Sequence, residues 1–407
     1  MGMINTFRSV VRFKQIETDP IERRLSGCAD ISDLRRIAKR RLPGGVFDYI
    51  DGGAEDELAL RRNSSAFGDL EFVPRVLRDV SVIDTTTTLF GRPLPYPLVL
   101  SPTGFTRIAH SQGELSVARS AARRGLPYSL STMGTRSIEE VARVSDGPKW
   151  FQVYTWKDRG LVKDLVDRAA AADYEALILT VDTAVLGRRE RDVRRGYTLP
   201  PKIGLDTLVD GAIHPGWSLD FLRNDPITFA NVASNNDASD GSSAVNLSEY
   251  INAQFDQALS WNDVEWLQSI WDGPIVLKGV QSVADATIAA DLGVAAVALS
   301  NHGGRQLDSA PAPIDLVGPV AQAVGGRIEI LADGGVRRGS DIVKAVALGA
   351  TAAMIGRPYL YGLGAAGERG VDFVLDFFEA GMRQTMALIG ATDVASLTPE
   401  LVAYRRR

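Results

Sequence analysis

One short segment of the chain contains the residue types that proton transfer and carboxylate binding require. His302 stands in a glycine-rich turn, and Arg305 follows it by three residues. An imidazole is well suited to accept a proton near neutral pH, and a guanidinium can hold a carboxylate through two parallel hydrogen bonds. The other two histidines, His110 and His214, follow no strand-like run and are expected to be structural. We therefore interpret His302 as a catalytic base.

Two other turns have the composition of a phosphate site. Asp333-Gly334-Gly335 ends one apolar run with Arg337 close behind, and Gly356-Arg357 ends the next. Glycines let backbone N–H groups approach a phosphate, and an arginine adds charge-assisted hydrogen bonds. The two turns predict phosphate binding by Arg337 or Arg357.

Lys278 ends a further apolar run. Its ammonium is either a fixed positive charge beside a bound ligand or half of a buried ion pair with a neighbouring carboxylate. The residues around it leave both interpretations open.

Eight short apolar runs, rich in β-branched residues, precede these motifs and others like them. Helical periodicity separates most of them, as in 114–124, 160–172, 283–292 and 339–348. Strands that alternate with helices indicate a parallel sheet, and eight such units predict a (β/α)8 TIM barrel, an α/β fold whose active site lies at the carboxyl ends of its strands. The predicted strands are Pro97–Ser101, Tyr128–Ser131, Trp150–Thr155, Ala176–Asp182, Pro274–Gly279, Ala295–Asn301, Glu329–Gly335 and Ala352–Pro358.

Two regions exceed a minimal barrel. Residues 1–90 are expected to form an N-terminal helical extension before a barrel at 91–390, with a C-terminal tail at 391–407. A long loop excursion at 196–260 separates the fourth and fifth strands. It includes the low-complexity run Ala233–Ala244, which we expect to be mobile.

The composition excludes several classes of protein. Among 407 residues the net charge is −5, too small to suggest a nucleic-acid partner. The only cysteine is Cys28, so neither an intrachain disulfide nor a thiolate metal cluster is expected, and no metal site is predicted. No secretory signal or membrane-spanning run is present, which predicts a cytoplasmic protein.

The motifs together resemble those of the FMN-dependent L-2-hydroxy acid dehydrogenases and oxidases. The segment from Ser300 to Asp308, Ser-Asn-His-Gly-Gly-Arg-Gln-Leu-Asp, is similar to the active-site signature of that family. Further similar segments are 47–57, 150–154, 180–183 and 333–335, so the resemblance extends from about residue 30 to 395. It implies an FMN cofactor, oxidation of a 2-hydroxy acid and a homotetramer.

The resemblance also implies a role for each matching residue. His302 would take the proton, Asp182 would bond its other ring nitrogen, and the Tyr154 hydroxyl would contact the reacting end of the substrate. Arg305 and Arg189 would hold the substrate carboxylate. The implied cofactor-binding residues are Pro102, Thr103, Gly104, Ser131, Gln152, Thr180, Lys278, Ser300, Asp333, Gly334, Gly335, Arg337, Gly356 and Arg357.

Three positions differ from some members of the family. Phe47 stands where many have a tyrosine that helps to bind the carboxylate, so we expect Phe47 at the substrate without that contact. Met133 replaces a tryptophan of glycolate oxidases, which suggests a reshaped substrate pocket, and Gly104 replaces an alanine of many oxidases. Phe47 and Gly104 together look most like bacterial L-lactate dehydrogenases, whose electron acceptor is a quinone or another membrane acceptor.

The first part of the excursion, 196–232, contains the segment His214–Phe221 and also resembles the corresponding part of membrane-associated mandelate and lactate enzymes. Its apolar residues are expected either to form a peripheral surface at the inner face of the cell membrane or to pack on the barrel or a neighbouring subunit. They are Leu205, Leu208, Val209, Ile213, Trp217, Leu219, Phe221, Leu222 and Phe229.

The leading hypothesis is therefore oxidation of L-lactate to pyruvate, with electrons passed to a quinone. A mandelate-type dehydrogenase and an oxygen-using oxidase are close alternatives. An FMN barrel isomerase and a catalytically silent flavin-binding protein are more distant ones. A barrel of the inosine-phosphate dehydrogenase type is discarded, because Cys28 lies far before every predicted strand.

Overall fold

The computed structural model describes residues 17–195, 205–232 and 254–405. Eight parallel strands close into a barrel in the order β10-β11-β4-β5-β6-β7-β8-β9. Each predicted run overlaps one of these strands, so the predicted (β/α)8 barrel is confirmed. The strands are β4 (Leu98–Leu100), β5 (Tyr128–Ser131), β6 (Lys149–Val153), β7 (Ala176–Thr180), β8 (Ile275–Val280), β9 (Ala296–Leu299), β10 (Glu329–Asp333) and β11 (Ala352–Ile355).

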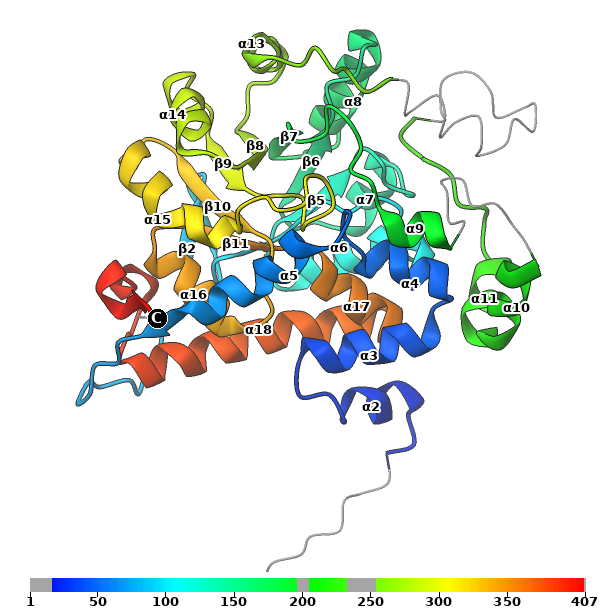
Figure 1. Ribbon diagram of the computed structural model, residues 1–407, viewed down its shortest axis with the longest axis horizontal. Helices are drawn as coiled ribbons and strands as arrows, with labels where there is room; N and C mark the ends of the chain where they lie inside the picture. Colours follow the sequence, from blue (N-terminus) through cyan, green and yellow to red (C-terminus); the bar gives the residue numbers. More distant parts are fainter. Residues whose placement is uncertain (1–16, 196–204, 233–253, 406–407) are drawn as a thin grey trace, which may run out of the picture.

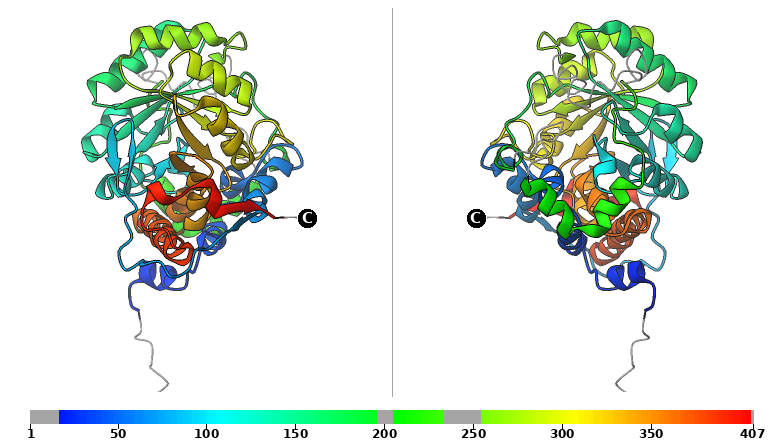
Figure 2. Two further views of the ribbon diagram at one scale, coloured as in Figure 1. Left: turned by 90° about the vertical axis from the view of Figure 1, so that its left-hand side faces the viewer. Right: turned by 90° about the vertical axis from the view of Figure 1, so that its right-hand side faces the viewer.

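Helices surround the barrel (Figure 2). The four helices predicted by residue range are found with ends that differ by at most one residue. The covering helices are α6 (Glu114–Arg123), α7 (Ile138–Val144), α8 (Arg159–Ala171), α13 (Trp261–Ile270), α14 (Val283–Asp291), α15 (Pro313–Val324), α16 (Gly339–Ala347), α17 (Arg357–Ala366) and α18 (Glu368–Ile389).

A hairpin packs against the residues that fill the barrel. The hairpin strands β2 (Thr87–Leu89) and β3 (Arg92–Leu94) place Leu89 and Leu94 in a cluster with Val99, Trp150 and other buried strand residues. Both residues of its turn, Phe90 and Gly91, have positive φ, as the two-residue turns that suit the twist of a hairpin require. Burial of the strand residues on both faces explains why the eight runs are almost entirely apolar.

The region before the barrel contains more than helices. It has α2 (Pro20–Leu25), α3 (Ile31–Arg41), α4 (Gly44–Asp51) and α5 (Leu58–Ser65). It also has a short strand, β1 (Leu70–Phe72), which pairs antiparallel with β12 (Val402–Tyr404) near the other end of the chain. Strands of three residues leave too short a pattern to be found in the sequence.

The excursion after β7 is partly helical. It forms α9 (Glu190–Arg194), α10 (Leu205–Ile213) and α11 (Pro215–Leu222), and Figure 1 shows the last two together at one side of the molecule. Of the nine apolar residues named from the sequence of the excursion, five have exposed side chains: Val209, Ile213, Leu219, Phe221 and Leu222.

Two apolar residues of the excursion pack against the barrel side of the molecule instead of forming an exposed surface. Phe229 is 1% exposed and its ring lies 4.8 Å from that of Phe105. Trp217 is half-buried, and its indole N–H donates to the carbonyl of Ile108 over 2.7 Å. Both pack on the loop that follows β4, which is the alternative that the sequence left open. The run Ala233–Ala244 and the side chains of Leu205 and Leu208 lie outside what the structure describes.

None of the helices in the described part of the chain combines the length and the apolar character needed to cross a bilayer.

Candidate active site

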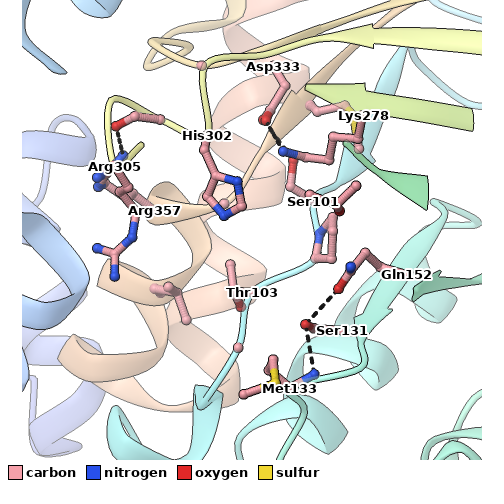
Figure 3. Close-up of a pocket in the computed structure, with 18 of the residues that line it drawn as sticks. Ser101, Thr103, Ser131, Met133, Gln152, Lys278, His302, Arg305, Asp333 and Arg357 are labelled. Carbon is pink, nitrogen blue, oxygen red and sulfur yellow. Dashed lines mark hydrogen bonds and ion pairs between the residues drawn. The ribbon is translucent and has the colours of Figure 1, made fainter. Parts of the chain in front are cut away.

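A cavity of about 210 Å³ opens at the carboxyl ends of the barrel strands. Most of the residues selected from the sequence line it, and Figure 3, in which ten of the lining residues are labelled, shows them coming together from strand ends and from the segments that follow the strands. Those that line it are His302, Tyr154, Arg305, Arg189, Met133, Pro102, Thr103, Gly104, Ser131, Gln152, Thr180, Lys278, Asp333, Gly334, Gly335, Arg337, Gly356 and Arg357. Of the remaining three, Asp182 and Ser300 touch residues of the wall, whereas Phe47 lies elsewhere.

His302 is paired with Asp182. The imidazole Nδ1 lies 3.0 Å from the Asp182 carboxylate, which can only accept, so the proton belongs on Nδ1 and Nε2 is left for other partners. Burial, the larger effect, lowers the pKa of His302 below its ordinary 6.5, and the Asp182 charge raises it less. The ring is therefore neutral, and able to accept a proton, at neutral pH.

The backbone of His302 adopts an unusual conformation. Its φ is +58°, a left-handed value that is uncommon outside glycine. The His302 backbone N–H donates to the Ser300 hydroxyl over 3.0 Å, which helps to hold this turn. Ser300 is fully buried and does not line the cavity.

Lys278 forms the buried ion pair that the sequence left as one of two interpretations. Its ammonium lies 2.8 Å from Asp333 and 3.1 Å from the Ser300 hydroxyl. The Ser300 and Ser101 hydroxyls also donate to the same carboxylate, over 2.7 and 2.8 Å. Burial alone would raise the pKa of Asp333, but Lys278 and these hydroxyls hold it below its ordinary value. Lys278 also lines the cavity, so the two interpretations are compatible.

Two arginines are held by the carboxyl-terminal end of α4. Arg305 donates to the carbonyls of Tyr49 and Gly52, and Arg357 donates to those of Ile50, Gly52 and Gly303. The last carbonyls of a helix carry partial negative charge, which favours cations there.

The guanidinium of Arg305 is charged but costly to bury. Its centre lies 4.9 Å from the Tyr49 ring centroid, and that of Arg189 lies 6.0 Å from the same ring. Burial, followed by the repulsion of Arg189, lowers the pKa of Arg305 to about 9. Arg305 still carries its charge at neutral pH, and a bound anion would relieve the repulsion.

The expectation that Phe47 contacts the substrate is wrong. Phe47 is 3% exposed and packs under Arg35 and Lys39 of α3, with its ring 5.5 and 5.9 Å from their charged groups. Tyr49 lines the cavity instead. Residues two apart on a helix face nearly opposite directions, so only one of these two aromatic rings can reach the site. A tyrosine, Tyr49, therefore lines the cavity, although the sequence analysis assigned this position to Phe47 and expected its hydroxyl to be missing.

Glycines shape the end of the cavity where β10 and β11 stop. Gly335 has a φ of +83°, and a Cβ there would lie 1.9 Å from the Asn63 carbonyl, so no other residue fits. Gly356 is the N-cap of α17, whose first helical residue is Arg357. A helix N-terminus with a neighbouring arginine favours an anion such as phosphate.

Polar atoms beside the cavity are left without partners within the described residues. They are Gln152 Nε2, Arg189 Nε and Asp182 Oδ2. The side-chain oxygen of Gln152, Oε1, accepts a hydrogen bond from the Ser131 hydroxyl over 2.9 Å, which holds the side-chain amide in place. Buried donors without partners are rare in proteins, so the two donors on residues that line the cavity, Gln152 Nε2 and Arg189 Nε, indicate places where a ligand binds. The described residues contain no cluster of side chains suited to a metal ion.

Sequence reasoning missed the apolar wall of the cavity. Phe105, Leu186, Phe229 and Phe255 line it in addition to Met133. Phe255 reaches the site because its backbone pairs with Trp156 just after β6, which brings its ring 5.1 Å from that of Tyr154. Phe229 and Phe255 lie in or beside the excursion, where no strand pattern marks them.

Comparisons with known proteins agree on one family. The family model described as FMN-dependent dehydrogenase matches residues 38–404. L-lactate dehydrogenase of Caulobacter vibrioides is 43% identical over 92% of this chain and 97% of its own, and L-lactate oxidase of a Nostoc species is 42% identical over the same shares. A crystal structure of the monotopic membrane protein (S)-mandelate dehydrogenase superposes with a TM-score of 0.89 at 39% identity, over 93% of this chain and all of that one.

The Lys278–Asp333 pair yields a stability prediction. Replacing Asp333 with Leu leaves the ammonium buried without a counter-charge, which should lower the free energy of unfolding by about 3–5 kcal/mol. The Lys278→Met/Asp333→Leu double variant, which buries no charge, should recover much of this loss. Urea unfolding followed by circular dichroism measures both. Equal losses in the single and double variants would show that the pair contributes no charge compensation.

Proposed function

The chain belongs to the family of FMN-dependent dehydrogenases, as its motifs predict, and we propose that it oxidises L-lactate to pyruvate with a quinone as electron acceptor. The observation that supports this most directly is one cavity lined by a paired imidazole, by the neighbouring arginines Arg189 and Arg305, and by a buried lysine. Together these groups suit removal of hydrogen from the α-carbon of a small hydroxy acid.

The lining residues fit FMN. The unpaired Gln152 amide N–H and the Lys278 ammonium offer donors to the carbonyls and nitrogens of a flavin ring, and the Gly335 and Gly356 turns suit its phosphate. When bound, the flavin accepts the two electrons that leave the substrate. Arg337 and Arg357 would add charge at the phosphate end. The ring would lie against Pro102, Thr103 and Gly104 of the loop after β4.

His302 then acts as the general base. Nε2 of its neutral ring accepts the proton that the substrate loses during oxidation. The hydrogen bond from Nδ1 to Asp182 fixes the ring and stabilises the imidazolium that forms. Arg305 and Arg189 hold the substrate carboxylate, which offsets their mutual repulsion. Burial raises the pKa of Tyr154 well above its ordinary value, so its phenol stays protonated and can donate to the substrate.

The choice of acid rests on the apolar wall and on the relatives. Lactate needs space for one methyl group, and the large side chains of Phe105, Met133 and Phe255 limit the room in the cavity. Relatives of similar identity are named for lactate, and the similar crystal structure is named for mandelate. A larger aryl acid therefore remains the second candidate.

A substrate panel tests this proposal. Purified protein should release FMN, rather than FAD, on denaturation, and should lose its yellow colour anaerobically on addition of L-lactate faster than with glycolate or (S)-mandelate. Reoxidation is then compared between a soluble quinone and dissolved oxygen. Faster bleaching by mandelate would identify an aryl acid as the substrate. No bleaching by any acid would contradict the proposed oxidation.

The assignment of His302 predicts a pH dependence. Because the base must be neutral and burial lowers its pKa, kcat/KM should rise with pH and level off, with a midpoint below 6.5. Asp182→Asn removes the charge that raises this pKa, so the midpoint should move to lower pH while the plateau falls. His302→Gln should keep its FMN and lose about 10²–10⁴-fold in turnover. A parallel loss of FMN from His302→Gln would indicate a structural histidine.

The acceptor is proposed to be reached at a membrane. Ile213 and Leu222 are 68% and 77% exposed on α10 and α11. Arg188, just before α9, and Arg194, at its end, are more than two-thirds exposed, and both pair with Glu190. Apolar and basic side chains together favour binding at an anionic lipid surface. A homo-oligomer, implied by the resemblance, would leave this surface free only if its subunit contacts lie elsewhere.

Substitution on these helices tests the membrane proposal. Ile213→Ser/Leu222→Ser should lower liposome binding and quinone reduction together, by about tenfold or more, because two exposed apolar groups leave the interface. Flavin reduction by lactate should not change. Ile288→Ser, an exposed isoleucine on α14, is the matched control. Unchanged quinone activity in the double variant would remove α10 and α11 from acceptor binding.

A further inference from the structure

Helix α9 has no apolar anchor. None of its residues, Glu190–Arg194, is buried. Its N-cap residue, Arg189, nevertheless lines the cavity. Helix α9 lies beside α4 (Figure 1). The Arg188 carbonyl, just before α9, accepts a hydrogen bond from the Glu55 N–H over 2.9 Å, and the remaining support of Arg189 comes from the polar contacts between α9 and the region of α4.

Those contacts are ion pairs to acidic residues on and just after α4. The Arg191 guanidinium bonds Asp51 over 2.9 Å and Glu57 over 2.5 Å. Arg195, just beyond α9, bonds Asp48 over 3.0 Å. Asp51 is the most deeply buried of the three carboxylates, at 4% exposure against 17% and 13% for Asp48 and Glu57. A buried pair is screened less by solvent than an exposed one, so the Asp51 contact should hold α9 most firmly.

Asp51 is itself fixed from two further sides. Arg35 of α3 donates to both of its carboxylate oxygens, over 2.5 and 2.7 Å, and the Tyr361 hydroxyl of α17 donates over 2.7 Å. Burial would raise the pKa of Asp51, but Arg35, Tyr361 and Arg191 lower it to about 2. The carboxylate is therefore ionised at any pH at which the protein works.

The same turn of α4 also holds the other arginine of the site. The carbonyls of Tyr49 and Gly52, on either side of Asp51, accept hydrogen bonds from Arg305. The Tyr49 ring faces both Arg305 and Arg189. One turn thus fixes Arg305 through its backbone and Arg189 through the Asp51–Arg191 pair.

We propose that Asp51, acting through Arg191, is a positioning residue that sets the spacing of Arg189 and Arg305 and so the affinity of the site for a carboxylate. The proposal rests on the proposed function, which assigns carboxylate binding to these two arginines. It adds a residue, outside the cavity, on which substrate affinity depends. Its effect should fall on binding rather than on proton transfer, because Asp51 contacts neither His302 nor Asp182.

The two arginine partners of Asp51 provide a matched pair of variants, because they lie on different helices. Arg191 connects it to α9 and the site, whereas Arg35 connects it to α3 and away from the site. Arg191→Met and Arg35→Met each remove one guanidinium from the same carboxylate while keeping an apolar side chain of similar length. A structural role of Asp51 alone would make the two variants equivalent.

The experiment uses the FMN-loaded protein and titrates oxalate, a small dicarboxylate, by the change in flavin absorbance. Arg191→Met and Asp51→Asn should raise the oxalate dissociation constant and the KM for the acid by about 10- to 100-fold, as expected for a misplaced binding group. In dye-linked assays kcat should change less than threefold. The Arg191→Met/Asp51→Asn variant should be no weaker than the worse single variant. Arg35→Met should lower the Tm and leave oxalate affinity unchanged.

Two results would overturn the inference. Unchanged oxalate affinity in Arg191→Met would show that α9 is held without Asp51. An equal loss of affinity in Arg35→Met would show that Asp51 only supports α4. Arg305→Lys and Arg189→Met serve as reference variants. If these two also leave oxalate binding unchanged, the carboxylate site itself is misassigned, and the proposed function fails rather than this refinement of it.

Discussion

The compensation of buried positive charge governs the arrangement of this protein. Arg305 and Arg357 lie within one side of a cavity, with Arg189 close to Arg305. Uncompensated cations in such a place would cost several kcal/mol each. The carbonyls at the end of α4 supply most of the compensation by accepting four hydrogen bonds, and the Gly303 carbonyl on the barrel side accepts a fifth. A helix outside the barrel is therefore part of the active site.

The opposite side of the cavity is balanced by carboxylates. Asp333 neutralises Lys278, and Asp182 faces His302. The Ser300 hydroxyl accepts hydrogen bonds from the Lys278 ammonium and the His302 backbone N–H, and it donates to Asp333. One hydroxyl therefore connects the two pairs. Catalytic groups held by such a network do not have to reorganise when charge moves during the reaction. The barrel supplies this rigidity because all of these residues lie near or just after the carboxyl ends of its strands.

The sequence was most informative where strand patterns repeat. The eight strands, the pairing of His302 with Asp182 and most of the cavity lining follow from apolar runs that end in polar residues, together with a long family motif. Phe47 was misplaced because a motif comparison alone cannot tell which face of α4 points inward. The side chains of residues two positions apart on a helix, such as Phe47 and Tyr49, point in directions about 200° apart. Phe229 and Phe255 could not be found, since their positions depend on contacts between segments far apart in the chain rather than on any local period.

The β1–β12 pairing has a consequence for how the chain is made. Arg405, at the end of this pair, contacts Glu71, 334 residues earlier. A ribosome that adds about 5–20 residues each second would separate the synthesis of these two residues by roughly 17 to 67 s. During that interval the first strand has no partner, and the barrel lacks its final strand for most of the same period. Completion of the fold therefore waits for the last strands to be made, and until then the nascent chain exposes an open sheet edge.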